Sequence, residues 1–432
     1  MRILRQLNKY PELKSGIELV RKISELGYET CLAGGCVRDI VRYQMHQIGK
    51  LDIHDIDIAT AAPMEVLKAN FRTESNNGEK HGTLLVFEDG IPFEVTHFRT
   101  DGDYTDCRHP DTVEMASTFK EDAARRDFTI NAMGMTHTGE ILDYFGGIED
   151  ISHQLVRSVG TPVDRFNEDA LRIIRGIRFA LNLGYVIDET TVEGMKACSE
   201  KIENVSKERI RDELLKLNDY NKHLYNFLRL LMRTDALFHI SAFKDVDWAD
   251  AFDDIRALTH LTKENVVPAL AYVTGGYRTL EGLVATREEK RRYRWYTDYD
   301  YRLDRDEPLR DKLYWTLLVD FLSGDYEVVL DHLFGSRIYP SERVLPSWLQ
   351  GDYARAKYIV QNMPDQKGLV KTVRDMNIPA GKEFGDALDE LTEAKYKELA
   401  DSIPEEQEVR IGNSLVKYKM VDVSSAKENI YG

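Results

Sequence analysis

The chain has 432 residues, and its 42% hydrophobic share suffices for the cores of about three domains at ~150 residues each. A formal net charge of −16 argues against a protein that holds nucleic acid by bulk charge alone, so such contact requires local basic patches. Apolar runs too short to span a membrane, and an N-terminus without a signal-peptide pattern, predict a soluble, cytoplasmic protein with no membrane partner. The four cysteines fit neither a disulfide framework nor a zinc site, so we expect reduced thiols.

Residues 1–150 mix strand and helix patterns. YETCLAGG predicts a strand that runs into a glycine turn, CVRDIVRYQM predicts the helix after it, and DIDIAT predicts the next strand. A helix is expected to begin at Pro63, and GTLLVFEDGIPFEVTHFR predicts a hairpin with its turn at Asp89 and Gly90. NAMGMTHTGEILDYFGG predicts a second hairpin. We therefore expect an α+β head over residues 1–150.

A polar segment between Arg99 and Lys120 interrupts the head. The stretch TDGDYTDCRHPDTVEMAST is too long for an idle connection, which indicates a functional loop. Beyond about Ile151 the strand patterns stop and helix follows helix. We therefore expect a helical neck over residues 151–220 and an all-helical body and tail over residues 221–432.

Two aspartates mark the strand predicted in DIDIAT. Asp55 and Asp57 share one face of a strand, with backbones roughly 6 to 7 Å apart. Two carboxylates at that separation repel by roughly 2 to 3 kcal/mol at an effective dielectric near 20. A divalent cation offsets this repulsion, and Mg²⁺ takes one or two carboxylates plus substrate phosphates. We therefore expect Mg²⁺, as a pair of ions; a solvated acidic edge strand is the alternative that the pattern leaves open.

Other polar residues add to this candidate site. Gly34 and Gly35 occupy the predicted strand-to-helix turn, where backbone N–H groups can face a phosphate, with Arg38 one turn further on. Glu94 is a candidate third carboxylate from a neighbouring strand, although a surface or hydrogen-bonded role is equally open. The stretch ARRDFTINAM, expected to open a strand, holds donors for phosphate or ribose oxygens and acceptors for a ribose hydroxyl at Arg125, Arg126, Asp127 and Asn131.

The stretch NEDALRIIRGIRFALNLG predicts a long amphipathic helix. We expect Asn167 to be its N-cap and Gly184 its stop. One face carries Glu168, Arg172 and Arg175 with Asp169 at its edge, opposite an apolar stripe. An ordinary surface helix with ion pairs between neighbouring turns is the alternative. Three arginines spaced three apart, Arg172, Arg175 and Arg178, favour a ligand role for this helix instead.

Asp169 and Arg172 suggest a way to read a nucleotide base. Asp169 can only accept hydrogen bonds, and Arg172 can only donate them. Cytosine and adenine both present an amino donor beside a ring-nitrogen acceptor, whereas uracil and guanine present the reverse. A fixed Asp169 and Arg172 pair would therefore admit C and A and reject U and G.

Several of these stretches occur together in a known family. LAGGCVRD, DIDIATAAP, EKHGTLLV, FEVTHFRTDGDYTDCRHPD, ARRDFTINAM, LDYFGGIEDI, EDALRIIRGIRFA and SKERIRDEL follow one another in this order. Up to about Leu215 the chain resembles the class II tRNA nucleotidyltransferase and poly(A) polymerase family, in particular its CCA-adding enzymes. The resemblance implies a polymerase-β-like nucleotidyltransferase head followed by a helical neck, body and tail.

The resemblance also implies residue roles. Asp55 and Asp57 would be the catalytic, metal-binding pair, Asp127 would lie near the ribose, and Gly35, Arg38 and Arg126 would contact the incoming nucleotide. Asp169 and Arg172 would read the base, while Arg175 and Arg178 would bind phosphate or support the reader. A flexible loop over residues 101–110, with Asp106 and Arg108, would act in the switch from C to A. KERIRDEL would be the helical turn that supports the pocket.

The implied reaction adds C, C and A to the 3′ end of tRNA. The terminal hydroxyl attacks the α-phosphate of CTP or ATP, and pyrophosphate leaves. An A-adding tRNA nucleotidyltransferase, a poly(A) polymerase and a non-catalytic nucleotide- or RNA-binding protein remain alternatives. The long spacer between Asp39 and Asp55 and the histidine at His109 depart from the family pattern.

The contacts with tRNA are expected in the second half of the chain. Residues 287–305, REEKRRYRWYTDYDYRLDR, interleave basic and aromatic side chains, which suits a phosphate backbone; a charged helix surface is the alternative. We expect residues 221–432 to bind tRNA, and no obligate protein partner is evident.

Overall fold

The structure is a computed structural model of the whole chain. It describes residues 7, 9–51, 55–74, 82–102, 113–258, 261–274, 276–293, 362, 364, 366–376, 378–379, 381–402, 406–411 and 414–419. The chain divides into two compact units, Met1–Val246 with Arg278–Val284, and Asp247–Tyr277 with Ala285–Gly432. Among the helices in these described ranges, none combines the length and the apolar character that a membrane crossing requires.

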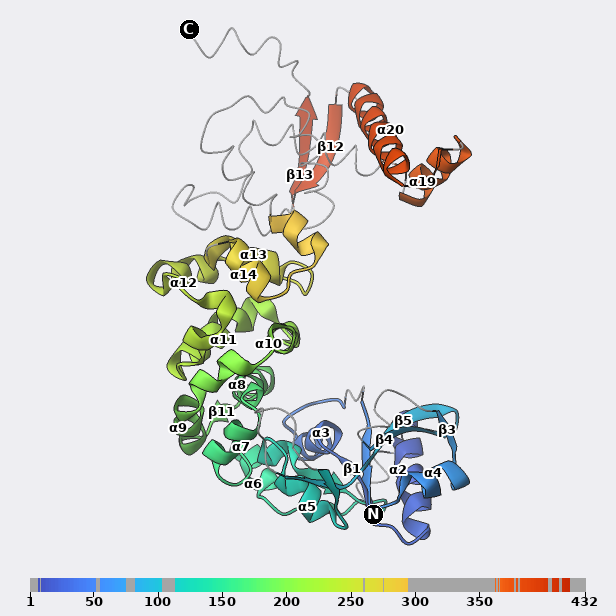
Figure 1. Cartoon of the computed structure of the whole chain (residues 1–432), viewed down its shortest axis with the longest axis vertical. Coiled ribbons are helices and arrows are strands. Elements are labelled where there is room, and N and C mark those ends of the chain that lie inside the picture. Colours follow the sequence, from blue (N-terminus) through green and yellow to red (C-terminus); the bar gives the residue numbers. More distant parts are fainter. Residues whose placement is uncertain are drawn as a thin grey trace. The chain divides into compact units, whose positions relative to one another are not determined.

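A seven-stranded mixed sheet forms the head, in the order β3-β4-β5-β2-β1-β8-β9 (Figure 1). Its strands are β1 Thr30–Ala33, β2 Asp57–Thr60, β3 Arg72–Glu74, β4 Thr83–Glu88, β5 Ile91–His97, β8 Met133–Met135 and β9 Ile141–Asp143. The pairing of β2 with β5 is parallel and the other pairings are antiparallel. The expected head with a mixed sheet and two hairpins is therefore confirmed.

The central strands carry the start of the predicted site. β1 is buried throughout and leads through Gly34 into α3 Gly35–Gln44. β2 lies between β1 and β5, with Asp57 opposite Ala33 on one side and Glu94 on the other. An apolar cluster that includes Cys31, Ala33, Ala59, Phe98 and Phe119 packs these strands against their neighbours. The ends of β1 and β2 are therefore held in place by a rigid core.

Further helices complete the head: α2 Pro11–Glu25, α4 Met64–Asn70, α5 Phe119–Ala124 and α6 Gly147–Ser152. α2 buries the apolar face formed by Leu13, Leu19, Val20 and Ile23, and it contacts β1 and β4. α4 follows Pro63, as the sequence predicted. These helices cover the sheet and leave the ends of β1 and β2 available to the site.

The polar segment between Arg99 and Lys120 contains more regular structure than expected. β6 Arg99–Asp101 pairs with β7 Val113–Met115 in a small antiparallel sheet. α5 then begins with a capping box, in which Thr118 and Glu121 bond each other's backbone N–H groups. The predicted loop residues Asp106 and Arg108 lie outside the described residues.

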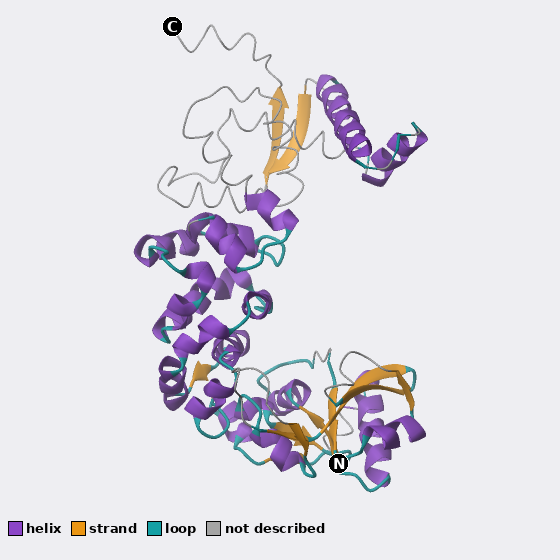
Figure 2. Cartoon of the chain, viewed as in Figure 1, coloured by secondary structure: helices purple, strands orange, loops and turns teal. Residues whose placement is uncertain are grey.

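Helices dominate the rest of the first unit, as Figure 2 shows. They are α7 Pro162–Glu168, α8 Leu171–Leu183, α9 Glu189–Ala197, α10 Lys207–Leu215 and α11 Tyr220–Arg233. The second unit contributes α12 Trp248–Ala257, α13 Val266–Thr274, α19 Gln366–Asp375 and α20 Lys382–Asp401, and α14 Tyr277–Gly282 crosses the boundary between the units. The expected helical character after the head is confirmed in the main.

Two strand pairs correct the expectation that this part is all helical. β10 Leu155–Val156 pairs in parallel with β11 Val186–Ile187, because two short apolar dipeptides can satisfy their backbone groups together. β12 Glu406–Ile411 and β13 Ser414–Lys419 form an antiparallel hairpin in the tail. Only part of each strand alternates between polar and apolar residues, at positions 409–411 in β12 and 416–419 in β13.

The long helix predicted from Asn167 is also corrected, because it consists of two helices. α7 runs from Pro162 to Glu168, so Asn167 lies inside it and is not an N-cap. Asp169 has an extended backbone, with φ −149° and ψ 103°, and its carboxylate accepts a hydrogen bond from Leu171 N at 3.0 Å. Such a local bond competes with helix formation, so the break falls at Asp169.

Candidate functional site

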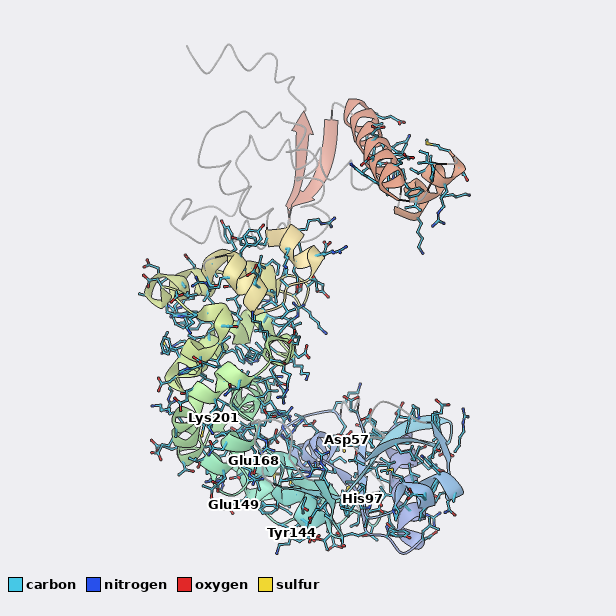
Figure 3. All side chains as sticks on the ribbon, viewed as in Figure 1. Asp57, His97, Tyr144, Glu149, Glu168 and Lys201 are labelled. Atoms are coloured by element: carbon cyan, nitrogen blue, oxygen red, sulfur yellow. The ribbon has the colours of Figure 1, made fainter. Side chains whose placement is uncertain are left out.

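A cavity of about 710 Å³ lies in the first unit, within the usual size range of small-molecule sites. The end of β1, the start of β2, the start of α3, the segment after α5, and helices α8 and α10 line it. It brings together most of the residues predicted from sequence: Gly34, Gly35, Arg38, Asp55, Asp57, Arg125, Arg126, Asp127, Asn131, Asp169, Arg172 and Arg175. Figure 3 shows Asp57 in the head and Glu168 at the end of α7.

Asp55 and Asp57 supply the acidic wall of the cavity. Asp57 is the first residue of β2 and Asp55 lies two residues before the strand, so β2 is shorter than DIDIAT predicted. Although Asp57 is exposed, the surrounding protein atoms desolvate its carboxyl group and raise its pKa. Arg126 lowers the pKa of Asp57, whereas Glu94 and Asp55 raise it further. The acidic wall thus carries unbalanced negative charge.

This wall suits a hard cation. Within the described residues, neither the Asp55 nor the Asp57 carboxylate has a hydrogen bond or an ion pair. Carboxylate oxygens are preferred ligands of Mg²⁺, which completes its shell with water and substrate phosphates. No group of three His, Cys, Asp or Glu side chains in the described part of the chain is placed to hold a metal. The role of Glu94 as a third carboxylate therefore stays a prediction.

The turn between β1 and α3 allows close approach to the acidic wall. Gly34 has a φ of 76°, a conformation that favours glycine. A Cβ atom at Gly34 would lie 3.2 Å from Nη1 of Arg126 and 3.9 Å from Oδ2 of Asp57. Gly34 and Gly35 both line the cavity at the start of α3, and the N-terminus of a helix is a place that suits an anion.

Arg38 and Arg126 are held by acidic and amide partners. Arg38 donates from Nε and Nη2 to Asp39, at 3.1 and 2.8 Å, and from Nη1 to Oδ1 of Asn131 at 2.8 Å. Arg126 donates to Oδ2 of Asp122 at 3.2 and 3.0 Å and to the carbonyl oxygen of Asn131 at 3.2 Å. Asn131 therefore links two arginines that the sequence assigned to nucleotide binding.

Asp122 anchors the arginine pair at the end of α5. Burial would raise the pKa of Asp122, but Arg126 and Arg125 together hold it below its ordinary value. Arg125 and Arg126 follow a helix and precede the 3-10 turn Thr129–Asn131, so the expectation that they open a strand is wrong. The capped helix α5, which ends directly before Arg125, positions the two arginines instead.

Asp127 is buried and paired with α8. Its Oδ2 accepts hydrogen bonds from Nε and Nη2 of Arg175 at 2.9 and 2.7 Å, and its Oδ1 accepts from Phe128 N at 2.8 Å. Burial would raise the pKa of Asp127, but Arg175 holds it below its ordinary value. The predicted contact of Asp127 with a ribose stays a prediction.

Asp169 and Arg172 both line the cavity but have separate partners. Asp169 is paired with Arg209 of α10, at 2.6 Å from Nη2 to Oδ2 and 3.3 Å from Nη1 to Oδ1. Nη1 of Arg172 donates to Glu168 at 2.6 Å and to the carbonyl oxygen of Arg165 at 3.1 Å. Its Nη2 donates to the carbonyl oxygen of Arg125 at 3.0 Å. Both side chains are therefore fixed at the cavity, as the base-reading hypothesis requires.

Arg178 differs from the other predicted arginines. It is buried, it does not belong to the cavity lining, and its Nε donates to Oε2 of Glu213 at 2.6 Å. Its guanidinium lies 4.1 Å from the ring centre of Phe179, which does line the cavity. This geometry favours the supporting role of Arg178 over direct phosphate contact.

Sequence reasoning gave no individual role to three charged residues of the lining, Asp39, Asp122 and Arg209, although Arg209 lies in the segment expected to support the pocket. For Asp122, the spacing of three and four to Arg125 and Arg126 is a usable signal, because such pairs meet on a helix. Asp39 directly follows Arg38, but adjacency alone does not predict its bidentate contact. Arg209 lies within the quoted motif SKERIRDEL, yet its partner Asp169 is too distant in sequence for any local rule.

Comparison with known proteins finds two family matches in this region. Residues 30–157 match the family described as the poly A polymerase head domain, and residues 184–241 match a probable RNA- and SrmB-binding site of polymerase A. A CCA-adding enzyme of Limosilactobacillus reuteri (strain DSM 20016) is 44% identical over 199 residues, which cover 46% of this chain and 48% of that protein. The chain thus spans about half the length of the curated relatives it matches.

Solved structures share the fold. The crystal structure of the Bacillus stearothermophilus CCA-adding enzyme in complex with CTP has a TM-score of 0.64 and 25% identity, and the match covers 91% of this chain and 98% of that one. The Thermotoga maritima CCA-adding enzyme complexed with tRNA-CCA has a TM-score of 0.58 and 19% identity, and the match covers 93% of this chain and 98% of that one. At this identity the likeness shows a shared fold alone. Residues 30–157 therefore resemble the head domain of poly A polymerases and residues 184–241 resemble their RNA-binding region, in line with the resemblance that the motifs of the sequence carry.

Proposed function

We propose that this chain adds C, C and A to the 3′ end of tRNA, using CTP and ATP and releasing pyrophosphate. One observation carries the proposal: a single cavity holds the Asp55 and Asp57 carboxylates, which have no hydrogen bond or ion pair among the described residues, together with the N-terminus of α3, several arginines and a fixed acceptor and donor, Asp169 and Arg172. The names of the relatives and the CTP bound to a structural neighbour support the same activity.

The basic side of the cavity suits a nucleoside triphosphate. Arg38 and Arg126 present planar donors, and the start of α3 adds backbone N–H groups and a favourable dipole. Asn131 keeps the two guanidinium groups in register, so a phosphate chain would meet preorganised donors. These groups would place the α-phosphate next to the acidic wall.

Asp55 and Asp57 would hold two Mg²⁺ ions, because their hard oxygens line the cavity with no hydrogen bond or ion pair in the described part of the chain, and because the neighbouring Glu94 adds further negative charge. When bound, the ions would lower the pKa of the attacking 3′ hydroxyl group and neutralise the charge that develops on the phosphate. Arg126, which already lowers the pKa of Asp57, would hold the triphosphate beside these carboxylates. The ions held by the two aspartates would thus lie between the acidic wall and the basic side of the cavity that binds the triphosphate.

Asp169 and Arg172 would select the base. Arg172 has five N–H donors, of which three are engaged within the described part of the chain, so two remain for a ring nitrogen. Asp169 accepts from Arg209 and from Leu171 N and can still accept from an amino group. Cytosine and adenine match this order of donor and acceptor.

The tRNA itself would contact the helical part. Residues 184–241 match an RNA-binding family region, and a neighbour with this fold is complexed with tRNA-CCA. Only residues 287–293 of the basic stretch 287–305 are described, and there Arg291 and Arg292 contact Glu288. That stretch therefore stays a prediction, as does a cytoplasmic location, which the proposed substrate favours.

The test incubates the purified full-length chain with a tRNA that lacks its 3′ CCA, with each NTP singly and with all four together, in the presence of Mg²⁺. Sequencing gels should show C, C and A added in that order. Addition of A alone, only to tRNA that already ends in CC, would replace the proposal with an A-adding enzyme. Long A tails on any RNA would indicate a poly(A) polymerase, and no product with any NTP would contradict an enzymatic role.

A further inference from the structure

The Asp169 carboxylate is held from outside its own helix. Arg209 of α10 meets it with two nitrogens on two oxygens, and only 16% of the Asp169 side chain and 26% of the Arg209 side chain are exposed. A guanidinium that contacts both oxygens fixes the plane of a carboxylate as well as its position. Both residues line the cavity, so this fixed plane faces the space that a nucleotide would occupy.

The other contacts of Asp169 leave its orientation to Arg209. Asp169 lies in the break between α7 and α8, where its extended backbone imposes no helical rotamer. Its only further side-chain bond within the described residues is the one accepted from Leu171 N. Arg172 holds Glu168 instead, so it does not orient the Asp169 side chain.

We propose that Arg209 is a positioning residue that sets base selection by fixing the Asp169 carboxylate. This inference rests on the proposed function, and it concerns nucleotides whose pairing edge carries an amino donor. A carboxylate has about four lone-pair sites. Arg209 and Leu171 N occupy three of them, so the remaining site on Oδ2 is the one that meets the base. Without Arg209 the carboxylate can turn, and its acceptor no longer meets a defined atom of the base.

The test compares three variants of the full-length chain. Arg209→Met keeps the length of the side chain without its donors, and Arg209→Lys keeps the charge without the fork. Arg211→Met is the matched control, because Arg211 lies on the same helix but donates to the carbonyl oxygens of Leu283 and Val284. For each variant, kcat/KM is measured for CTP and UTP on tRNA lacking CCA, and for ATP and GTP on tRNA ending in CC.

We expect Arg209→Met to lower the CTP/UTP and ATP/GTP ratios roughly tenfold or more, because a site loses discrimination when its hydrogen-bonding group is no longer fixed. Arg209→Lys should recover part of the ratio, and Arg211→Met should keep the ratio of the unmodified chain. A general loss of stability slows all four nucleotides alike and does not change the ratios. Melting temperatures measured in parallel identify such a loss.

If Arg209→Met turns over too slowly, competition between CTP and UTP for equilibrium binding gives the same ratio without catalysis. An unmodified chain that adds C and A, together with an Arg209→Met variant of unchanged selectivity in both assays, overturns the inference and leaves the proposed function in place. An unmodified chain that adds no nucleotide removes the proposed function and the inference together.

Discussion

Asp127 and Arg175 join the head to the first long helix of the neck. The buried Asp127 carboxylate lies between α5 and the 3-10 turn Thr129–Asn131, and it accepts two hydrogen bonds from the guanidinium group of Arg175 on α8. Arg175 also lies 3.8 Å from Glu213 of α10, which in turn pairs with Arg178. This chain of charges sets the position of α8, and therefore of Arg172, relative to the acidic wall.

We predict that Asp127→Asn lowers the free energy of unfolding by about 1 to 3 kcal/mol, because a charged donor loses its partner in a largely enclosed place. Urea denaturation followed by circular dichroism measures this change. Asp245→Asn is the control: Asp245 pairs with Arg278 on the surface, where 71% and 58% of the two side chains are exposed, and such pairs contribute about 0 to 1 kcal/mol. Equal losses in the two variants would contradict a structural role for the Asp127 pair.

The same carboxylate predicts sensitivity to acid. The pKa of Asp127 is lowered in the folded chain, since Arg175 outweighs the effect of burial. A lowered carboxyl pKa contributes stability above the unfolded value, about 3.9, and this contribution is lost as the pH falls through the folded value. We therefore expect stability to fall below about pH 4, with a shallower fall in Asp127→Asn. Urea midpoints measured over that range test the slope, and parallel slopes would contradict the assignment.

The sequence predicted the central fold where local patterns determine it. The turn at Asp89 and Gly90 and the glycine entry to α3 follow from residues that lie side by side in the chain. The helix break at Asp169 was missed because the helical periodicity of the sequence continues across it. The Asp169 side chain accepts a hydrogen bond from Leu171 N, and this local bond ends one helix and begins the next. The hairpin of β12 and β13 was missed because each strand alternates only in part, although the sequence places Gly412 and Asn413, a common turn pair, between them.

Site residues were predictable when a motif placed them, but their partners were not. Asp57, Arg126 and Arg172 were identified from residue type and spacing, and the cavity brings them together. The pairing of Asp169 with Arg209 joins residues 40 positions apart. No periodicity connects α10 to the break before α8, so only the packing of the helices reveals that contact.

Asp57→Ala should abolish nucleotide transfer, lowering the rate by roughly 10³-fold or more, because the metal ions would lose a ligand. Folding should be unaffected or slightly stabilised, since Asp55 and Glu94 both raise the pKa of Asp57 and their charge is then relieved. Single-turnover assays with saturating Mg²⁺, together with thermal melting, measure both effects. Retained turnover in this variant would remove the metal role of Asp57.

The variant Glu94→Gln tests whether Glu94 is a third metal ligand or only adds negative charge beside Asp57. Glu94 lies opposite Asp57 in the register of β2 and β5 and is exposed. If Glu94 only adds charge, the variant keeps its rate at saturating Mg²⁺. A rate as low as that of Asp57→Ala would establish Glu94 as a ligand, and titration with Mg²⁺ distinguishes weaker metal binding from slower transfer.

Arg172→Ala should relax the choice of C and A over U and G by roughly ten- to a hundredfold, because the base loses its donor. Arg165→Ala is the matched control: Arg165 also pairs with Glu168 but lies outside the cavity lining. Addition from each NTP singly, expressed as ratios of kcat/KM, measures the choice. Unchanged rejection of UTP and GTP in Arg172→Ala would contradict the base-reading role.

Gly34→Ala tests the close approach at the start of α3. The substitution forces alanine into a φ of 76° and places its Cβ 3.2 Å from Nη1 of Arg126. Gly90→Ala provides a control with similar strain, because Gly90 has a φ of 80° but no atom within 4 Å of the added Cβ. Both variants should lose about 1 to 2 kcal/mol of stability from the backbone conformation.

Only Gly34→Ala should also raise the KM for CTP and ATP, since the displaced Arg126 no longer meets the phosphates in a preorganised position. An increase of roughly tenfold corresponds to the loss of one charge-assisted hydrogen bond. Steady-state kinetics on tRNA lacking CCA measure the KM, and denaturation measures the shared loss of stability. If both variants keep the KM of the unmodified chain, the contact between the glycine turn and Arg126 does not position the nucleotide.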